Sequence, residues 1–254
     1  METIGFIGTG TITAAIVRGL KVSNQRARPV LLSPRNAGLS AALAAQLPGV
    51  AVAASNQDVL DHSKLVVLAV RPQVAEVVLR GLRFAPDTPV ISLIAGLDHD
   101  RLRDWTGVTR ICRAIPLPFV EHCNDAVPIF PPMSEAIQLF GALGQAMPVE
   151  DRAAFDAYAA LSALMGSYFG IVEVAQGWGV AQGLPDGDAR AYLERLFANL
   201  GSVLQTSPLS LADLRRDHST AGGLNEQVFA EFMKAGGATA LTCALESVLR
   251  RIAG

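Results

Sequence analysis

Short apolar runs alternate with amphipathic stretches along the first 110 residues of the chain. The apolar runs are TIGFIG, PVLLS, KLVVLAV and PVISLIAG, and the stretches between them, such as TAAIVRGLKVS, space apolar residues as a helix does. Strands separated by helices of about ten residues are typical of βαβ units, and strands rich in Val, Leu and Ile indicate a parallel sheet covered on both faces. The pattern predicts an α/β fold with an N-terminal Rossmann domain on a doubly wound parallel sheet. The run TRICRAI (109–115) predicts a further strand, and EAIQLFGALGQ (135–145) a helix.

From Ala153 onward the pattern changes to long segments of helical periodicity without a strand-like run. It predicts an all-helical domain over residues 151–254, after the Rossmann domain of residues 1–150. The apolar positions of residues 153–180 go most of the way round the helix, so this segment is either central to its own domain or packed against another subunit. We expect the second arrangement, a homodimer formed through the helical domain.

Composition narrows the class of partner. The formal net charge is −2, the sequence pI is about 6.1, and no run of Lys or Arg occurs. The electrostatic footprint of a protein that binds nucleic acid or an anionic membrane is therefore absent, and we expect a small-molecule partner. The cysteines Cys112, Cys123 and Cys243 lack metal-type spacing, so we expect reduced thiols and no bound metal.

The start of the chain and its hydropathy bear on location. The sequence METIGFIGTG leads directly into a predicted strand, without the basic and apolar regions of a secretion signal. No uninterrupted apolar stretch approaches the ~20 residues of a membrane span. We expect a cytoplasmic protein that does not enter a membrane.

The stretch IGFIGTGTITAAI places two glycines between the first predicted strand and the first predicted helix. Gly8 permits a tight turn, Gly10 lets a pyrophosphate approach the backbone, and the helix beginning near Thr11 offers its N-terminal amides to the anion. The third fingerprint position is Thr13 rather than Gly or Ala. The strand before and the helix after favour dinucleotide binding over a purely structural turn.

The second predicted strand bears on the choice of cofactor. It ends at Ser33, where an NAD enzyme would offer an acid to the ribose hydroxyls, and Arg35 and Asn36 follow. These side chains can hydrogen-bond and neutralise a 2′-phosphate, which favours NADP(H), although Arg35 could also be a solvated turn residue. The strand VVLAV ends at Arg71 and Pro72, at the carboxyl edge where ligands bind in such sheets.

Near the C-terminus the sequence HSTAGGLNEQ (218–227) interrupts a helical region. The adjacent Gly222 and Gly223 give the backbone freedom, and the helix that resumes after them has unpaired amides at its start. Such a place can hold an anion, although a plain turn between two helices would have the same composition. His218 beside it is either a surface residue or a proton donor.

Several motifs together resemble the pyrroline-5-carboxylate reductase family. They are GFIGTGTITAAI, SPRN, SNQDVLDHSKLVVLAVRPQ, ISLIAGL and RAIPLPFV, followed by the helical half with STAGGLNEQ, in the family's order through nearly the whole chain. The resemblance implies an NADP-binding Rossmann domain, a helical dimerisation domain, and reduction of the cyclic imine 1-pyrroline-5-carboxylate to L-proline with NADPH.

The resemblance also implies roles for particular residues. The pyrophosphate would lie against Gly8, Thr9, Gly10, Thr11 and Ile12; the adenosine phosphate against Ser33, Arg35 and Asn56; and the nicotinamide against Ala69, Val70, Arg71 and Pro72. In the stretch 218–227 the implied catalytic residues are Thr220 and Asn225, and the implied substrate-binding residues are Gly222, Gly223 and Leu224. Reduction of a protonated imine needs orientation and electrostatics more than an acid–base triad, and none stands out in the sequence.

The substrate motifs depart from the family pattern. RAIPLPFV places Leu117 where the family has Asn, SALMGS (162–167) replaces GSGPAY, and TAGGLN replaces SPGGTT, with Asn225 at the Thr that contacts the imine nitrogen. Two alternatives to proline synthesis therefore stay open. One is a relative that acts on a different, bulkier imine, and the other is a dimer that binds NADP without turnover.

Overall fold

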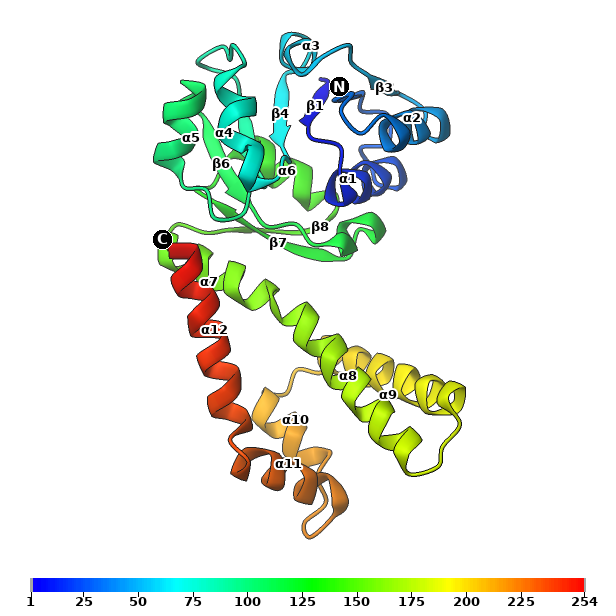
Figure 1. Cartoon of the computed structure of the whole chain (residues 1–254). Coiled ribbons are helices and arrows are strands. Elements are labelled where there is room, and N and C mark those ends of the chain that lie inside the picture. The colour runs from blue at the N-terminus through cyan, green and yellow to red at the C-terminus, as the bar shows by residue number, and fades with distance from the viewer. Residues whose placement is uncertain (1, 254) are drawn as a thin grey trace. The chain divides into compact units, whose positions relative to one another are not determined.

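The computed structural model describes residues 2–253, which divide into two compact units (Figure 1). The first unit extends to Ala159 and takes in the chain from Leu249 onward. The second unit covers Ala160–Val248.

The first unit is built on one sheet, with eight strands in the described residues and the order β3-β2-β1-β4-β5-β6-β7-β8. The strands are β1 (Ile4–Ile7), β2 (Val30–Leu32), β3 (Val50–Val52), β4 (Leu65–Leu68), β5 (Val90–Ser92), β6 (Ile111–Ala114), β7 (Asp125–Phe130) and β8 (Gly144–Pro148). The strands predicted from the apolar runs are confirmed as β1, β2, β4, β5 and β6. The Rossmann arrangement is confirmed as well. The predicted strands pair in parallel, and the sheet departs from this only further along, where β7 pairs with β6 antiparallel within the described residues.

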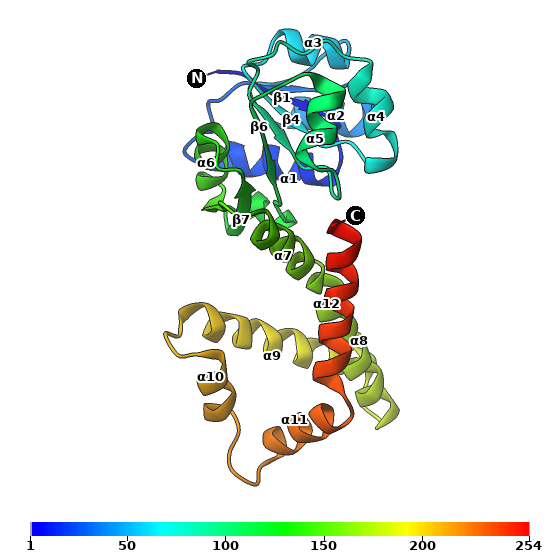
Figure 2. The same ribbon diagram turned by 90° about the vertical axis from the view of Figure 1, so that its left-hand side faces the viewer.

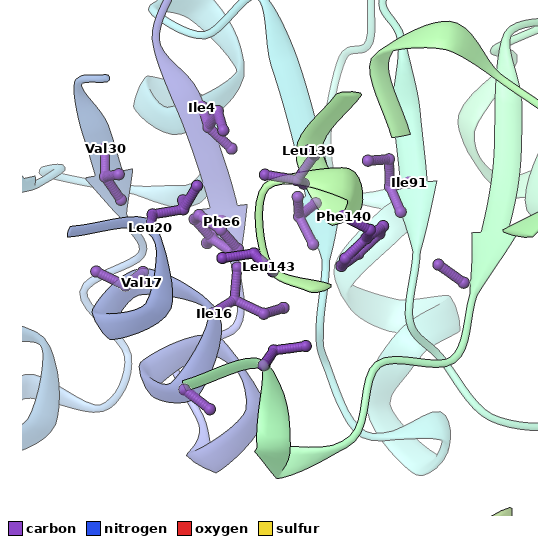
Figure 3. Packing of buried hydrophobic residues seen from close by; sticks show 14 of the residues in the cluster. Ile4, Phe6, Ile16, Val17, Leu20, Val30, Ile91, Leu139, Phe140 and Leu143 are labelled. Carbon is purple, nitrogen blue, oxygen red and sulfur yellow. The ribbon is translucent and has the colours of Figure 1, made fainter. Parts of the chain in front are cut away.

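Helices cover both faces of this sheet (Figure 2). They are α1 (Thr11–Val22), α2 (Ala37–Gln46), α3 (Asn56–Asp61), α4 (Pro72–Arg80), α5 (His99–Thr106), the 3-10 helix η1 (Pro118–His122) and α6 (Ser134–Gly141). In β1, Phe6 packs into the core on one face and Ile7 into the core on the other. Figure 3 shows the first of these cores, where Phe6 lies among Ile16 of α1 and Leu139 and Phe140 of α6.

Both faces are buried because the central strands are apolar at every position. All four residues of β1 and of β4 are buried, and in β4 Val67 faces the first core while Val66 and Leu68 face the second. A strand buried on both faces cannot show polar alternation, which is why these runs read as continuous in the sequence. The central strands therefore hold the loops at their carboxyl ends on a rigid base.

The second unit is all helical in the residues described, as the sequence predicts. The helices that follow the sheet are α7 (Arg152–Ser162), α8 (Leu164–Ala181), α9 (Asp186–Thr206), α10 (Leu211–Asp217), α11 (Leu224–Lys234) and α12 (Gly237–Ala253). α8 and α9 lie side by side and are joined by a short connection (Figure 1). Of the residues between Ala160 and Val248, only Ala160, Gly179 and Ala189 are buried.

The helical unit therefore leaves much apolar surface open in a single chain. In α8 the side chains of Ile171, Val174 and Trp178 are exposed by 59%, 74% and 68%. Contiguous apolar patches of this kind are rare on monomeric proteins and mark interaction surfaces. One segment, Arg152–Ala181, is long and apolar enough to cross a membrane by length and composition, with a mean hydropathy of 1.3. The sequence analysis considered only uninterrupted apolar runs and so did not identify this longer segment. The segment is weak evidence for a membrane span, because core helices of other proteins meet the same criterion.

Candidate cofactor and substrate sites

Three loops meet at the carboxyl edge of the sheet. β1 lies between β2 and β4 and is parallel to both, so the loops that follow these strands emerge side by side. The chain leaves β1 toward β2 on one side, while β4 is added on the other side, which makes the gap between β1 and β4 a topological switch point. Nucleotides bind at such points in open α/β sheets. The predicted cofactor residues lie in these loops or in the first turn of the helix that follows, except Asn56, which follows the next strand outward, β3.

The glycine loop after β1 has a geometry that only small residues permit. Gly8 has a φ of +103°, and a Cβ added there would lie 2.5 Å from the carbonyl oxygen of Ala69. Gly10 precedes α1 without a side-chain cap, and a Cβ there would meet nothing within 4 Å. The first amides of α1 thus face open space beside a residue without a side chain, which fits a bound pyrophosphate. The hydroxyl of Thr13 donates to the Gly8 carbonyl at 2.7 Å, which explains this departure from the fingerprint.

Side chains from the end of β2 hold this loop in place. The amide of Gly8 donates to the Ser33 hydroxyl at 2.9 Å, and the Thr9 hydroxyl donates to the Ser33 carbonyl at 3.0 Å. The amide nitrogen of Asn36 donates to the Thr9 carbonyl at 3.0 Å. Ser33 is fully buried, so its side chain supports the loop from beneath rather than facing the ribose phosphate as expected. The sequence analysis predicts a contact between Ser33 and the adenosine phosphate, whereas in the structure Ser33 bonds the glycine loop.

Arg35 and Asn56 differ in how far they are engaged. Arg35 is exposed and makes no ion pair or side-chain hydrogen bond with any residue from 2 to 253, which leaves its guanidinium available to an anion. Asn56 is half-buried at the start of α3, where the hydroxyl of Ser55 caps the helix by accepting from the amide of Asp58 at 3.0 Å. Arg35 follows β2 and Asn56 follows β3, and both of these strands lie on the same side of β1.

The loop after β4 lies against the glycine loop. The amide of Ala69 donates to the carbonyl of Ile7 at 2.8 Å, and the Gly8 backbone approaches Ala69 and Val70 too closely for a side chain. Arg71 is the exposed N-cap of α4, and Pro72 occupies the first helical turn, where its missing amide costs no hydrogen bond. The residues predicted to line the nicotinamide thus adjoin those predicted to hold the pyrophosphate.

A buried charged cluster lies further along the same edge, and the sequence analysis did not predict it. Arg113 of β6 pairs with Asp156 of α7 at 3.5 Å, each side chain being 7% exposed, and its guanidinium lies 4.7 Å from the centre of the Phe155 ring. Burial lowers the pKa of Arg113. His99 begins α5, and burial together with the positive charge of Arg113 lowers its pKa to about 4, so its imidazole is neutral near pH 7.

Leu117 changes the motif that follows β6. Its backbone amide donates to the carboxylate of Asp125 at 2.7 Å, and its side chain is half-buried. Burial raises the pKa of Asp125. The carboxylate therefore fixes the backbone of this segment, and the position at which the family pattern has Asn presents an apolar side chain.

The five residues predicted for catalysis and substrate binding lie together in the loop before α11 and in the first turn of that helix. α11 begins at Leu224, directly after Gly222 with a φ of +72° and Gly223, whose amide donates to the Thr220 carbonyl at 2.8 Å. The amide nitrogen of Asn225 donates to the His218 carbonyl at 2.6 Å. The side chain expected to meet an imine nitrogen is therefore engaged inside the loop.

Two further contacts change the picture of this loop. The Gly222 amide donates to the carboxylate of Glu226 at 2.7 Å, a contact that the sequence analysis did not consider. His218 is exposed and its Nδ1 bonds the Leu214 carbonyl at 2.8 Å, which favours a surface role over that of proton donor. The double-glycine turn thus already holds a carboxylate, although one that the chain itself supplies.

The cysteines carry no reactive arrangement in the described residues. Cys112, Cys123 and Cys243 are all free, and burial raises the pKa of Cys112 to about 12. Between residues 2 and 253 no group of three or more His, Cys, Asp or Glu side chains could hold a metal ion. The chemistry of the chain thus centres on the loops at the sheet edge and before α11.

Two family models match the chain, one in each half. A model described as NADP oxidoreductase, coenzyme F420-dependent, matches residues 3–96, and one described as pyrroline-5-carboxylate reductase dimerisation matches residues 152–254. A pyrroline-5-carboxylate reductase of Pisum sativum is 28% identical over 235 residues, 87% of this chain and 84% of the relative. One from Pseudomonas aeruginosa is 26% identical over 261 residues, 98% of this chain and 95% of the relative. The chain resembles the pyrroline-5-carboxylate reductase family along nearly its whole length.

Solved structures of this family share the fold. The 1-pyrroline-5-carboxylate reductase of Streptococcus pyogenes superposes with a TM-score of 0.85 at 24% identity, covering 99% of this chain and 98% of its own. The Plasmodium falciparum enzyme, solved with NADP bound, gives a TM-score of 0.82 at 17% identity, covering 99% and 97%. A reductive aminase of Aspergillus terreus is more distant, with a TM-score of 0.61 at 15% identity and coverage of 98% and 90%.

These findings confirm the family resemblance and the two-part fold. They also establish the chain as an oxidoreductase with a nicotinamide cofactor, and the dimerisation model indicates assembly with further copies of the chain. The assignments of individual site residues rest on the geometry described above and remain predictions.

Proposed function

We propose that the chain reduces the C=N bond of 1-pyrroline-5-carboxylate with NADPH and so forms L-proline. The observation that carries this proposal is the pyrroline-5-carboxylate reductase dimerisation model over residues 152–254, joined to a nucleotide-binding edge at the β1–β4 switch point. The curated relatives that match along nearly the whole chain bear the same name. The dimer without turnover has no comparable support, because the relatives are named as reductases.

The residues of the sheet edge would act by binding and orientation. Gly8 and Gly10 leave room for the pyrophosphate, the first amides of α1 stabilise its charge, and Ala69 and Val70 adjoin the nicotinamide position. When bound, the cofactor supplies a hydride to the imine carbon. A pyrroline nitrogen takes up a proton readily, so the chain needs to place the ring rather than to activate it. Orientation of this kind can lower a barrier by ~7–11 kcal/mol.

The choice of NADPH over NADH rests on the loop after β2. No acid stands at Ser33, Arg35 is exposed and unpaired within the described chain, and Asn56 lies at the start of the next helix but one. A guanidinium binds a 2′-phosphate through charge-assisted hydrogen bonds, whereas NADH offers it only a hydroxyl. Because Ser33 is buried beneath the loop, Arg35 carries most of this preference.

The assembly that this function uses is a homodimer formed through the helical unit. The exposed side chains of Ile171, Val174 and Trp178 require a cover, and the match to a dimerisation model points to a second copy as that cover. The segment Arg152–Ala181 would then be apolar because it packs against the partner. Sedimentation at micromolar concentration should report at least a dimer, and a stable monomer would contradict this part of the proposal.

The test is turnover with defined substrates. Purified protein should oxidise NADPH in the presence of 1-pyrroline-5-carboxylate and release L-proline, and it should use NADH less efficiently. The same assay with bulkier cyclic imines examines the second candidate, which Leu117 favours by replacing a polar side chain. Tight NADPH binding without oxidation by any cyclic imine would refute the proposed reaction and support a dimer without turnover.

A further inference from the structure

The double-glycine turn is already occupied by a carboxylate from its own chain. A Glu226 carboxylate oxygen accepts from the Gly222 amide at 2.7 Å, while the Gly223 amide donates to the Thr220 carbonyl at 2.8 Å. The amides of Gly222 and Gly223 belong to the residues that the family resemblance implies for substrate binding. One is therefore engaged in the turn, and the other is bound by a group with the same chemistry as the substrate carboxylate.

The charge of Glu226 is not balanced by a neighbour in the described residues. Glu226 is exposed, and the ion pairs that involve α11 join Lys234 to Glu231, one helical turn beyond it. Glu226 lies in the first turn of α11, where the helix dipole favours a negative charge. Its carboxylate is thus stable beside the Gly222 amide, and a second carboxylate arriving there would have to displace it against charge repulsion.

Resting on the proposed function, we propose that Glu226 is a specificity-determining residue of this loop. Its carboxylate competes with the ring carboxylate of the substrate for the Gly222 amide. At the same time its negative charge attracts the protonated ring nitrogen of any cyclic imine. Glu226 therefore weakens the preference of the chain for imines that carry a carboxylate over imines that lack one. Without Glu226 the same loop would show a stronger preference.

A purely structural role predicts something different. A Glu at the third position of a helix commonly bonds backward to an amide before the helix and caps it. Removal of such a cap lowers stability but leaves the ratio of activities toward two substrates unchanged. The ratio therefore separates the two roles.

The experiment compares kcat/KM for 1-pyrroline-5-carboxylate and for 1-pyrroline, which lacks the carboxylate. In Glu226→Ala the ratio of the two values should rise by about tenfold, a shift that corresponds to ~1.4 kcal/mol. In Glu226→Gln the rise should be smaller, because the amide oxygen can still accept from Gly222 while the charge is gone. Glu231→Gln, on the same helix and outside the loop, should leave the ratio unchanged.

A binding measurement separates this proposal from the proposed reaction. Calorimetric titration of L-proline and of pyrrolidine into the protein with NADP⁺ should show the same rise in preference for the carboxylated ligand in Glu226→Ala. If the native protein reduces neither imine, the proposed reaction fails, and the two ligand affinities still decide the role of Glu226. The inference would be overturned if the ratio stayed within about twofold of the native value in both assays, for folded Glu226→Ala and folded Glu226→Gln. The expected change is about tenfold, which corresponds to ~1.4 kcal/mol.

Discussion

The two glycine loops of the chain are made of the same residue types but are held in different ways. The loop at Gly8 is held from outside by Ser33, Asn36 and the backbone of Ala69, which lie in the loops that follow the neighbouring strands β2 and β4. In the described residues, the hydrogen bonds that hold the loop at Gly222 join residues from His218 to Glu226, and this loop is largely exposed. Several segments that follow neighbouring strands hold the first loop, whereas the second loop depends on a few local contacts that single substitutions can change.

The largest effect should come from Gly8→Ala. The added Cβ would lie 2.5 Å from the Ala69 carbonyl oxygen, at a φ of +103° that side chains rarely adopt. We expect loss of NADPH binding by at least ~100-fold, or failure to fold, since strain and overpacking each cost ~1–3 kcal/mol.

Gly10→Ala is the matched control for this prediction, because its Cβ would meet nothing within 4 Å. It should fold with an unchanged circular dichroism spectrum and should weaken NADPH only by intruding on the pyrophosphate. Normal NADPH affinity in Gly8→Ala would show that the loop does not hold the cofactor by close backbone approach.

The second prediction examines whether the two loops act independently. In Gly223→Val the first added carbon would lie 2.8 Å from the Thr220 carbonyl oxygen, so the turn must open. Imine reduction should fall to the background rate, while NADPH affinity stays within about twofold, because the two loops belong to separate units and effects at independent sites are close to additive. Steady-state kinetics and an NADPH titration on the same preparation decide it, and normal reduction would mean that this stretch is only a turn.

The contrast between the loops also explains what the sequence could and could not predict. β1 and β4 were visible because a strand buried on both faces reads as an unbroken apolar run. β3 has only three residues, two of them exposed, and β7 and β8 contain prolines, so these strands gave no clear pattern. The antiparallel β6–β7 pair follows from long-range packing that no local period records.

The sites divide in the same way. The glycine fingerprint and the strand ends predict the loops in which we place the cofactor, because residue type and topology together determine where these loops lie. The pairing of Arg113 with Asp156 joins residues far apart in sequence, and the burial of Ser33 depends on the loop that covers it. Glu226 was within reach of sequence reasoning, since a Glu in the first turn of a helix often bonds backward to an amide before it.

A third prediction concerns the exposed part of the cofactor edge. Arg35→Asp replaces a free guanidinium with a carboxylate that repels a 2′-phosphate. NADPH binding should weaken by ~1.5–3 kcal/mol, the usual value for a hydrogen bond to a charged group, with little change for NADH. Arg83→Asp, an arginine elsewhere in the first unit, is the charge-matched control. Equal losses for both cofactors would show that Arg35 does not discriminate between them.

The smallest effect should come from Asn225→Ala, which examines how far the second loop depends on its own contacts. The substitution removes the 2.6 Å hydrogen bond from the Asn225 amide to the His218 carbonyl and should lower stability by ~1 kcal/mol, as the loss of a single hydrogen bond does. The thermal midpoint should fall in either case; if the amide also orients the imine nitrogen, kcat falls as well, while NADPH affinity changes little. Asn225→Asp keeps the size of the side chain but cannot donate, so it should share the defect in turnover. A loss confined to thermal stability, with native kcat in both variants, would assign Asn225 to the loop structure alone.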